Sequence, residues 1–235
     1  MLRRAARAIL DAVFPPQCAG CQRAGEQFCS GCRAQLSLLL APVCPKCGYP
    51  QAGEWLCRQC QARPRPELGG IRSAAFFEGP LLTAIHRFKY SNDLGLADAF
   101  GPLLKLCWNT HGLAADAIVP VPLSWERQRQ RGYNQAGLLA GSLATELALP
   151  VDHSALRRIR NTASQVTLSR TQREANVAGA FRAAADRVKG RTFALVDDVC
   201  TTGATLAACA EALREAGAAE VWAVTLARAR WDALD

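Results

Sequence analysis

Beyond residue 70, apolar and polar residues alternate in the order typical of an α/β domain. The apolar run at residues 193–196 is hydrophobic on both faces and stops abruptly at charge, which predicts a strand buried in a parallel sheet. The wider pattern predicts strands at residues 73–77, 116–121, 188–198 and 220–226, and helices at 80–90, 94–108, 135–147 and around 170–173. We therefore expect a parallel sheet flanked by helices.

The central strand ends in two adjacent carboxylates, Asp197 and Asp198. A turn of small residues follows and opens a helix; the turn is made of Thr201, Thr202, Gly203, Ala204 and Thr205. Free backbone N–H groups and the positive helix end make such a turn a phosphate cradle. The paired acids suit sugar hydroxyls or a hydrated Mg²⁺ ion. We expect a sugar with a terminal phosphate; a solvated acid pair before an N-capped helix is the purely structural alternative.

A basic segment directly precedes the helix expected at residue 135. Its arginines alternate with polar residues: Arg127, Arg129 and Arg131. Over residues 124–173 there are eight arginines and three acids, with Arg157 and Arg158 among them. A solvated surface usually mixes its charges, so this bias favours a phosphate-lined cleft in which Arg127 and Arg131 grip a pyrophosphate. Residues 161–165 predict a polar, mobile loop.

The helix expected at residues 80–90 closes with cations and aromatic rings, including Arg87, Phe88, Lys89 and Tyr90. Cations at a helix C-terminus commonly stabilise the helix dipole. A basic and aromatic cluster is also what single-stranded nucleic acid stacks on. Both interpretations stay open. Trp125 is a further ring that could stack on bases, and Arg129, Arg157 and Arg158 are further candidates for DNA binding.

Eight of the eleven cysteines form four C-x-x-C pairs near the N-terminus: Cys18/Cys21, Cys29/Cys32, Cys44/Cys47 and Cys57/Cys60. Two halves repeat this spacing, which predicts two consecutive zinc ribbons, each with four sulfur ligands and a structural Zn²⁺ ion. Disulfides and redox pairs are the alternatives; the absence of a signal peptide and the number of copies disfavour them. Cys107, Cys200 and Cys209 are expected to be small buried residues.

Residues 63–70 are dense in proline and glycine and predict a linker. We expect residues 1–62 to hold an N-terminal helix and the double zinc ribbon, and residues 71–235 to form the α/β domain, each with its own core. Residues 2–13 predict a short amphipathic helix, for which docking on the protein's own body is favoured over a membrane surface.

The net charge of +8 favours anionic partners. It is uneven, because residues 1–66 carry nine basic and three acidic side chains. Two zinc ions bound by thiolates would lower the total to about +4. No apolar run reaches the length of a membrane span, so we expect a cytoplasmic protein without a transmembrane segment.

The four Cys pairs, the segments at residues 88–90, 120–122 and 131–135, and the loop after Asp197 follow one another in an order that closely resembles the ComF family. This family of amidophosphoribosyltransferase-like proteins includes ComFC and GntX-type proteins. The resemblance implies a double zinc ribbon on a type I phosphoribosyltransferase fold. It assigns the ribose hydroxyls of phosphoribosyl pyrophosphate (PRPP), bound with Mg²⁺, to Asp197 and Asp198, and its 5′-phosphate to the turn at residues 201–205.

The resemblance leaves two functions open. ComF proteins are tied to natural transformation, which implies handling of single-stranded DNA and other competence proteins at the inner membrane as partners. The alternative is a working phosphoribosyltransferase with an unknown nitrogen acceptor. Purine salvage enzymes often carry an acid where this chain has Thr201, and no other residue is identified as a general acid or base.

Overall fold

The computed structural model describes residues 15–91, 93–162 and 169–231 of the 235-residue chain. The helix expected at residues 2–13, and residues 163–165 of the expected polar loop, lie outside this part. Within the described part, every helix is too short or too polar to cross a membrane.

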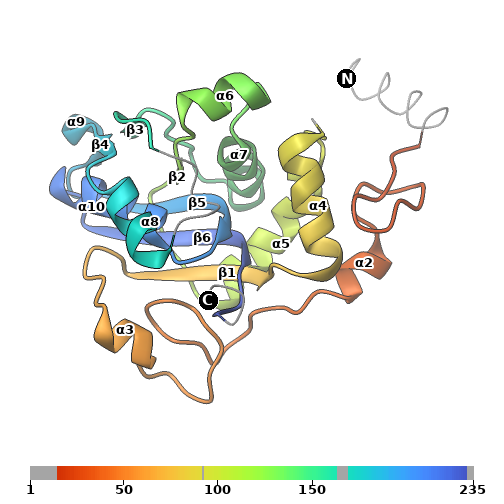
Figure 1. The fold of residues 1–235 in the computed structure, drawn as a ribbon, viewed down its shortest axis with the longest axis horizontal. Coiled ribbons are helices and arrows are strands. Elements are labelled where there is room, and N and C mark those ends of the chain that lie inside the picture. Colours follow the sequence, from red (N-terminus) through yellow and green to blue (C-terminus); the bar gives the residue numbers. More distant parts are fainter. Residues whose placement is uncertain (1–14, 92, 163–168, 232–235) are drawn as a thin grey trace.

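A four-stranded sheet forms the centre of the body (Figure 1). Its spatial order is β1 (Gly70–Phe76), β6 (Glu220–Arg228), β5 (Thr192–Cys200) and β2 (Ala117–Pro120). Every neighbouring pair runs parallel, which confirms the predicted parallel sheet.

The central strand β5 is buried on both faces. Phe193 and Leu195 belong to the core on one side of the sheet, and Ala194 and Val196 to the core on the other. The absence of a solvent-facing side explains the continuous apolar run. The strand begins later than residue 188, because a turn at Gly190 separates it from the short helix α9 (Ala185–Val188).

Helices cover both faces of the sheet. The first face carries α4 (Gly79–Tyr90), α5 (Leu96–Thr110) and α7 (Gln135–Leu147). The second carries α8 (Arg170–Val177), α10 (Ala204–Glu215) and a separate antiparallel pair, β3 (Leu156–Arg158) and β4 (Phe181–Ala183).

Several elements were not predicted, among them the β3–β4 pair. The arginine-rich segment, for which no helix was predicted, contains the helix α6 (Trp125–Arg131). Ser124 starts this helix, because its hydroxyl accepts a hydrogen bond from the Arg127 backbone N–H.

The N-terminal part forms two small lobes, called here the first ribbon (residues 18–32) and the second ribbon (residues 44–60). They contain the short helices α2 (Ser30–Ala34) and α3 (Arg58–Ala62). Figure 1 shows the first lobe, in red, beside α4 and the second, in orange, below β1. Between them, residues 37–39 pair with the edge of β1: the Leu39 N–H donates to Ala74 and the Phe76 N–H to Ser37. This pairing covers part of an otherwise open sheet edge.

The two parts of the chain do not have separate cores. Phe28 of the first ribbon is 1% exposed, and its ring lies 5.6 Å from that of Phe100 in α5. Leu68, inside the expected linker, is fully buried with the second core. The expectation of two independent cores is therefore wrong, whereas the domain boundary at residues 63–70 stays a prediction.

Candidate functional site

The eight N-terminal cysteines gather in two groups of four that follow the sequential pairing predicted from the repeat. Within each group all four Sγ atoms lie within 4.8 Å of one another. A zinc tetrahedron with Zn–S bonds of about 2.3 Å places its sulfurs about 3.8 Å apart. The Sγ–Sγ distances include 3.6 Å for Cys18–Cys32, 3.7 Å for Cys21–Cys29 and 3.7 Å for Cys47–Cys57. The donor sets therefore fit two structural zinc ions.

The same backbone contact recurs in both ribbons. The Cys29 N–H donates to Cys18 Sγ at 3.3 Å, and the Cys57 N–H donates to Cys44 Sγ at 3.5 Å. Such N–H···S bonds stabilise thiolate charge and orient the ligands. By contrast, Cys107, Cys200 and Cys209 are buried in the body, and burial raises the pKa of each thiol. All three are small buried residues, as expected.

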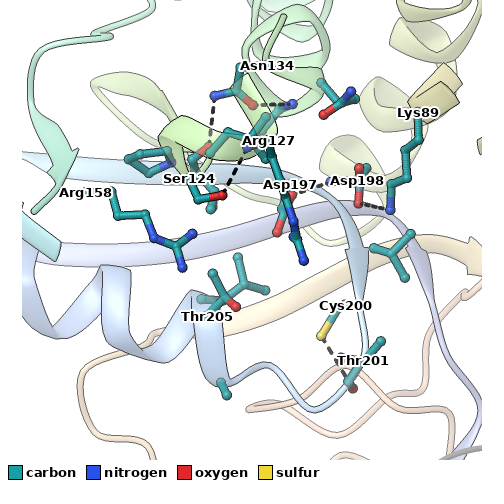
Figure 2. A pocket seen from close by; sticks show the side chains of 18 of the residues that line it. Lys89, Ser124, Arg127, Asn134, Arg158, Asp197, Asp198, Cys200, Thr201 and Thr205 are labelled. Carbon is teal, nitrogen blue, oxygen red and sulfur yellow. Dashed lines mark hydrogen bonds and ion pairs between the residues drawn. The ribbon is translucent and has the colours of Figure 1, made fainter. Parts of the chain in front are cut away.

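A cavity of about 480 Å³ opens at the carboxyl ends of β2 and β5. This is the edge of a parallel sheet at which α/β proteins bind ligands. Its walls come from the end of β5, the start of α10, the segment between β2 and α7, and the C-terminal end of α4. Figure 2 shows side chains from these segments converging on one space.

Asp197 and Asp198 form the acidic side of this cavity. The Asp198 N–H donates to the Asp197 carboxylate at 2.8 Å. Burial, together with the adjacent Asp198 charge, raises the pKa of Asp197 to about 7. Asp198 instead forms an ion pair with Lys89, whose Nζ lies 2.8 Å from Asp198 Oδ1. The two neighbours are thus electrostatically different, and both can accept hydrogen bonds from hydroxyl groups.

The turn after β5 supplies the opposite, N–H-rich side. Gly203 is the N-cap residue of α10 and has a φ of 77°. Because glycine has no side chain to cover the first turn of the helix, this turn lines the cavity. The Thr202 hydroxyl accepts the Ala204 N–H at 3.3 Å. Thr201, Gly203, Ala204 and Thr205 line the cavity, whereas Thr202 lines a smaller space on the other side of the turn. A helix N-terminus that lines a cavity in this way attracts a phosphate.

Arginines occupy the side facing the turn. Arg127 comes from α6 and Arg158 from β3, and Figure 2 shows both directed toward the space between Asp197 and Thr205. Arg131 also lines the cavity; it donates to Gln135 at 2.9 Å and lies 5.1 Å from the centre of the Tyr90 ring. Two or three guanidinium groups near a helix N-terminus suit a ligand with more than one phosphate.

Asn134, within the segment at residues 131–135, supports the cavity wall without lying among the predicted ligand-binding residues. Its side-chain amide donates to the Val121 carbonyl at 3.0 Å, and its carbonyl oxygen accepts the Ala136 N–H. It therefore ties the end of the β2 segment to the start of α7. An Asn directly before an apolar helical pattern is an N-cap signal, so the capping role was detectable.

The structure separates the DNA-binding candidates into three groups. Lys89, Tyr90 and Arg158 line the cavity, so they are shared with the predicted PRPP site. Arg129 lies over the half-exposed Trp125 ring at 4.9 Å, and Arg157 is exposed on β3. Arg87 pairs with Asp93 at 3.7 Å and donates to the Cys18 carbonyl.

The structure contradicts the predicted role of Phe88 in stacking on DNA bases. This residue is fully buried, within the core that contains Phe100, and cannot stack on a base. Leu81, Ala84, Ile85 and Phe88 form the buried stripe of α4. Their spacing is that of an amphipathic helix, so the sequence held the signal that was missed.

Comparisons with known proteins agree with this architecture. The double zinc ribbon domain family matches residues 9–61, and the phosphoribosyl transferase domain family matches residues 134–234. Among solved structures, the chain is similar to the glutamine PRPP amidotransferase of B. subtilis, with 21% identity over 59% of this chain and 30% of that chain, and a TM-score of 0.41.

Curated relatives cover most of the chain. DNA utilization protein YhgH of Escherichia coli is 39% identical over 77% of this chain and 82% of its own. Competence protein F of Haemophilus influenzae is 36% identical over 86% of this chain and 90% of its own. Competence protein ComFC of Bacillus subtilis is 33% identical over 86% of this chain and 85% of its own. The chain therefore belongs to the ComF family, with a double zinc ribbon joined to a phosphoribosyltransferase fold.

Proposed function

We propose that this ComF-family protein binds PRPP with Mg²⁺ and handles single-stranded DNA in the cytoplasm during natural transformation. The observation that carries the PRPP part is the shared cavity. It brings the acid pair of β5, the open N-terminus of α10 and the arginines of α6 and β3 around one space. Hydroxyl acceptors, a phosphate cradle and a cationic wall are the three groups that a pyrophosphorylated ribose phosphate requires.

Within this site, Asp197 and Asp198 would accept the ribose hydroxyls, and the N–H groups of residues 201–205 would hold the 5′-phosphate. Arg127 and Arg131 would face the pyrophosphate. A Mg²⁺ ion bound to PRPP would neutralise part of the pyrophosphate charge. Lys89 already pairs with Asp198, so ligand binding must share or displace this ion pair.

The test of the PRPP site is isothermal titration calorimetry with PRPP and Mg²⁺. Wild-type protein should bind, and the Asp197→Asn/Asp198→Asn double variant should bind much more weakly. The amides keep the shape of the site but remove the charged acceptors. Equal affinity in both proteins would reject the site assignment, and absence of binding in the wild type would reject the PRPP proposal.

The DNA part is supported by rings and cations at and beside the cavity. Tyr90 is 71% exposed next to Arg131, and Trp125 is 55% exposed under Arg129. An exposed ring next to a guanidinium group offers a surface for one base and a charge for one phosphate. The names of the relatives support the same direction, since they refer to DNA utilization and competence.

Binding of the same protein sample to a labelled single strand and to the matching duplex tests this part. We expect preference for the single strand, because only there are bases free to stack. Affinity should fall with salt by about 0.7 units of log–log slope per neutralised phosphate. In a transformable host, deletion should reduce transformation after DNA has entered the periplasm. Normal transformation in the deletion strain would favour the small-molecule function.

One observation supports the transferase alternative. Phe77, His86 and Tyr90 line the cavity beside Asp198, and the Phe77 and His86 rings stack at 6.0 Å. A ring wall beside a ribose site suits a planar nitrogen acceptor. Release of pyrophosphate from PRPP on addition of candidate nitrogen bases would establish this activity.

A further inference from the structure

The second ribbon lies directly against the turn that follows β5. A small space between them is lined by Cys47 and Cys60 on the ribbon side and by Thr201 and Thr202 on the turn side. The opposite side of the same turn lines the large cavity. The turn is therefore held between the ligand cavity and a zinc site.

Arg228 connects the zinc site with this turn. It ends β6 and is 3% exposed. Its Nη1 donates to the Cys47 carbonyl at 2.6 Å and lies 3.6 Å from Sγ of Cys200, the residue just before the turn. One guanidinium group thus contacts a zinc-ligand residue and the start of the phosphate cradle.

The charge of Arg228 has no carboxylate partner in the described part of the chain, and neither has that of Arg72 on β1. Both residues are buried, and the Nε atom of each lacks a hydrogen-bond partner. Arg72 also reaches the second ribbon, because its Nη1 donates to the Pro45 carbonyl at 3.0 Å. Uncompensated buried charge is costly. A Zn²⁺ ion with four thiolates carries a net charge of −2, which balances two arginines.

A second contact reaches the cradle from the segment after the second ribbon. A Cβ atom on Gly203 would lie 2.3 Å from Arg65 Nη1 and 3.0 Å from Ile71 Cδ1. Arg65 is in turn paired with Glu174 of α8 at 3.5 Å, and the Ile71 N–H donates to Lys46 of the second ribbon. Gly203 therefore packs directly against groups positioned by the ribbon.

We propose that zinc binding in the second ribbon and ligand binding in the cavity are thermodynamically linked, with Arg228 as the main connection and Arg65 as a support. The zinc–thiolate charge holds Arg228 in place, and Arg228 with Arg65 fixes the backbone of residues 200–205 in the form that presents its N–H groups. Among the described residues, the arginine that contacts the first ribbon is Arg87, which donates to the Cys18 carbonyl and is already paired with Asp93. The inference rests on the proposed PRPP site.

The matched test is Cys57→Ser against Cys29→Ser in the full-length protein. Both residues precede the short helix of their ribbon and occupy equivalent repeat positions. Each variant should lose one zinc ion. Cys57→Ser should weaken PRPP–Mg²⁺ binding about tenfold or more, within the usual range for coupled sites, and Cys29→Ser should change it little. Circular dichroism at the titration temperature must show a folded body in both variants. Equal weakening in the two folded variants, or no weakening in Cys57→Ser, overturns the linkage.

A second pair of variants decides the question if a Cys variant does not fold. Arg228→Met keeps all eight thiolates but removes the connection, whereas Arg230→Met removes a nearby arginine that pairs with Glu78. Arg228→Met alone should weaken PRPP binding and speed hydrogen exchange of the amides in residues 200–206. Unchanged affinity and exchange in Arg228→Met overturn the linkage.

Linkage is reciprocal, so PRPP should slow the transfer of one of the two zinc ions to a chelating dye. Biphasic release without PRPP, with only one phase slowed in its presence, is the expected result. Wild-type protein that binds PRPP yet releases both ions at unchanged rates contradicts the linkage. Wild-type protein that does not bind PRPP contradicts the proposed function instead, and the exchange measurement on Arg228→Met still tests the connection between ribbon and turn.

Discussion

The two zinc ribbons repeat one sequence pattern but join the body in different ways. The first ribbon contributes Cys18, Ala19, Phe28 and Cys32 to the larger core. Residues 40–62, which include the whole second ribbon, contribute none of the residues in either core cluster of the described chain. The second ribbon instead contacts the body through buried arginines and backbone carbonyls. A repeat in sequence therefore does not imply a repeated role: the first ribbon is part of the core, and the second lies against the turn that borders the cavity.

Removal of zinc should give the largest difference in stability between the two ribbons. Metal analysis of protein purified under reducing conditions should give two zinc ions per chain, and a ratio of one would reject the two-ribbon assignment. Structural zinc contributes on the order of 10 kcal/mol of apparent binding free energy in small domains, so chelation should unfold both ribbons. Loss of the first zinc should lower the melting temperature of the body more than loss of the second, because the first ribbon shares its core.

The next largest effect is expected from a pair of residues at equivalent positions of the repeat, Phe28 and Leu56. Each precedes the closing Cys pair of its ribbon. Phe28 is 1% exposed, whereas Leu56 is 38% exposed. Phe28→Ala should lower the free energy of unfolding by about 3–5 kcal/mol, the usual cost of an aromatic core deletion. Leu56→Ala should change it by less than about 0.5 kcal/mol, as surface substitutions do.

Urea denaturation followed by circular dichroism measures both changes. The control is zinc content, which must stay at two ions in each variant. Similar losses in the two variants would show that the ribbons are equally integrated into the body, against the comparison drawn above.

A smaller effect is expected at the cavity that the second ribbon supports. Asp198→Asn should weaken PRPP binding by about 1.5–3 kcal/mol, because it replaces a charged hydrogen-bond acceptor by a neutral one. It also removes the partner of Lys89. Asp98→Asn, an exposed carboxylate on α5, is the charge-matched control and should bind as the wild type does. Calorimetry that ranks the two variants equally would move the ribose site away from β5.

Local patterns in the sequence predicted much of this molecule. The apolar run of β5, the acid pair behind it and the four Cys pairs are short-range features, and the structure confirms the strand and the two Cys groups. The alternating arginines predicted a basic cavity wall, although not that α6 would form it. The assignment of individual residues to PRPP stays a prediction.

What the sequence did not reveal depends on contacts between distant segments. The Lys89–Asp198 ion pair joins positions over one hundred residues apart, and Arg228 donates to the Cys47 carbonyl, 181 positions away in the chain. No periodicity records such pairs. The error at Phe88 was different, because its place on the apolar stripe of α4 was visible in the sequence. The neighbouring cations and rings favoured stacking at this position, whereas the helical spacing indicated a place in the core.

The smallest effect is expected for single-stranded DNA, and it tests whether DNA follows the cavity rim or the second ribbon. Trp125 beside the cavity and Trp55 on the second ribbon are almost equally exposed, at 55% and 59%. If bases stack on the rim, Trp125→Ala should weaken binding by about 1–2 kcal/mol with little change in salt dependence. Trp55→Ala should leave the affinity unchanged. Arg129→Ala should lower the log–log salt slope by about 0.7, the amount expected for one lost phosphate contact. Fluorescence anisotropy with a labelled oligonucleotide at several salt concentrations separates these effects. A loss confined to Trp55→Ala would place the DNA on the second ribbon, so that this lobe would serve both the nucleic acid and the phosphate cradle.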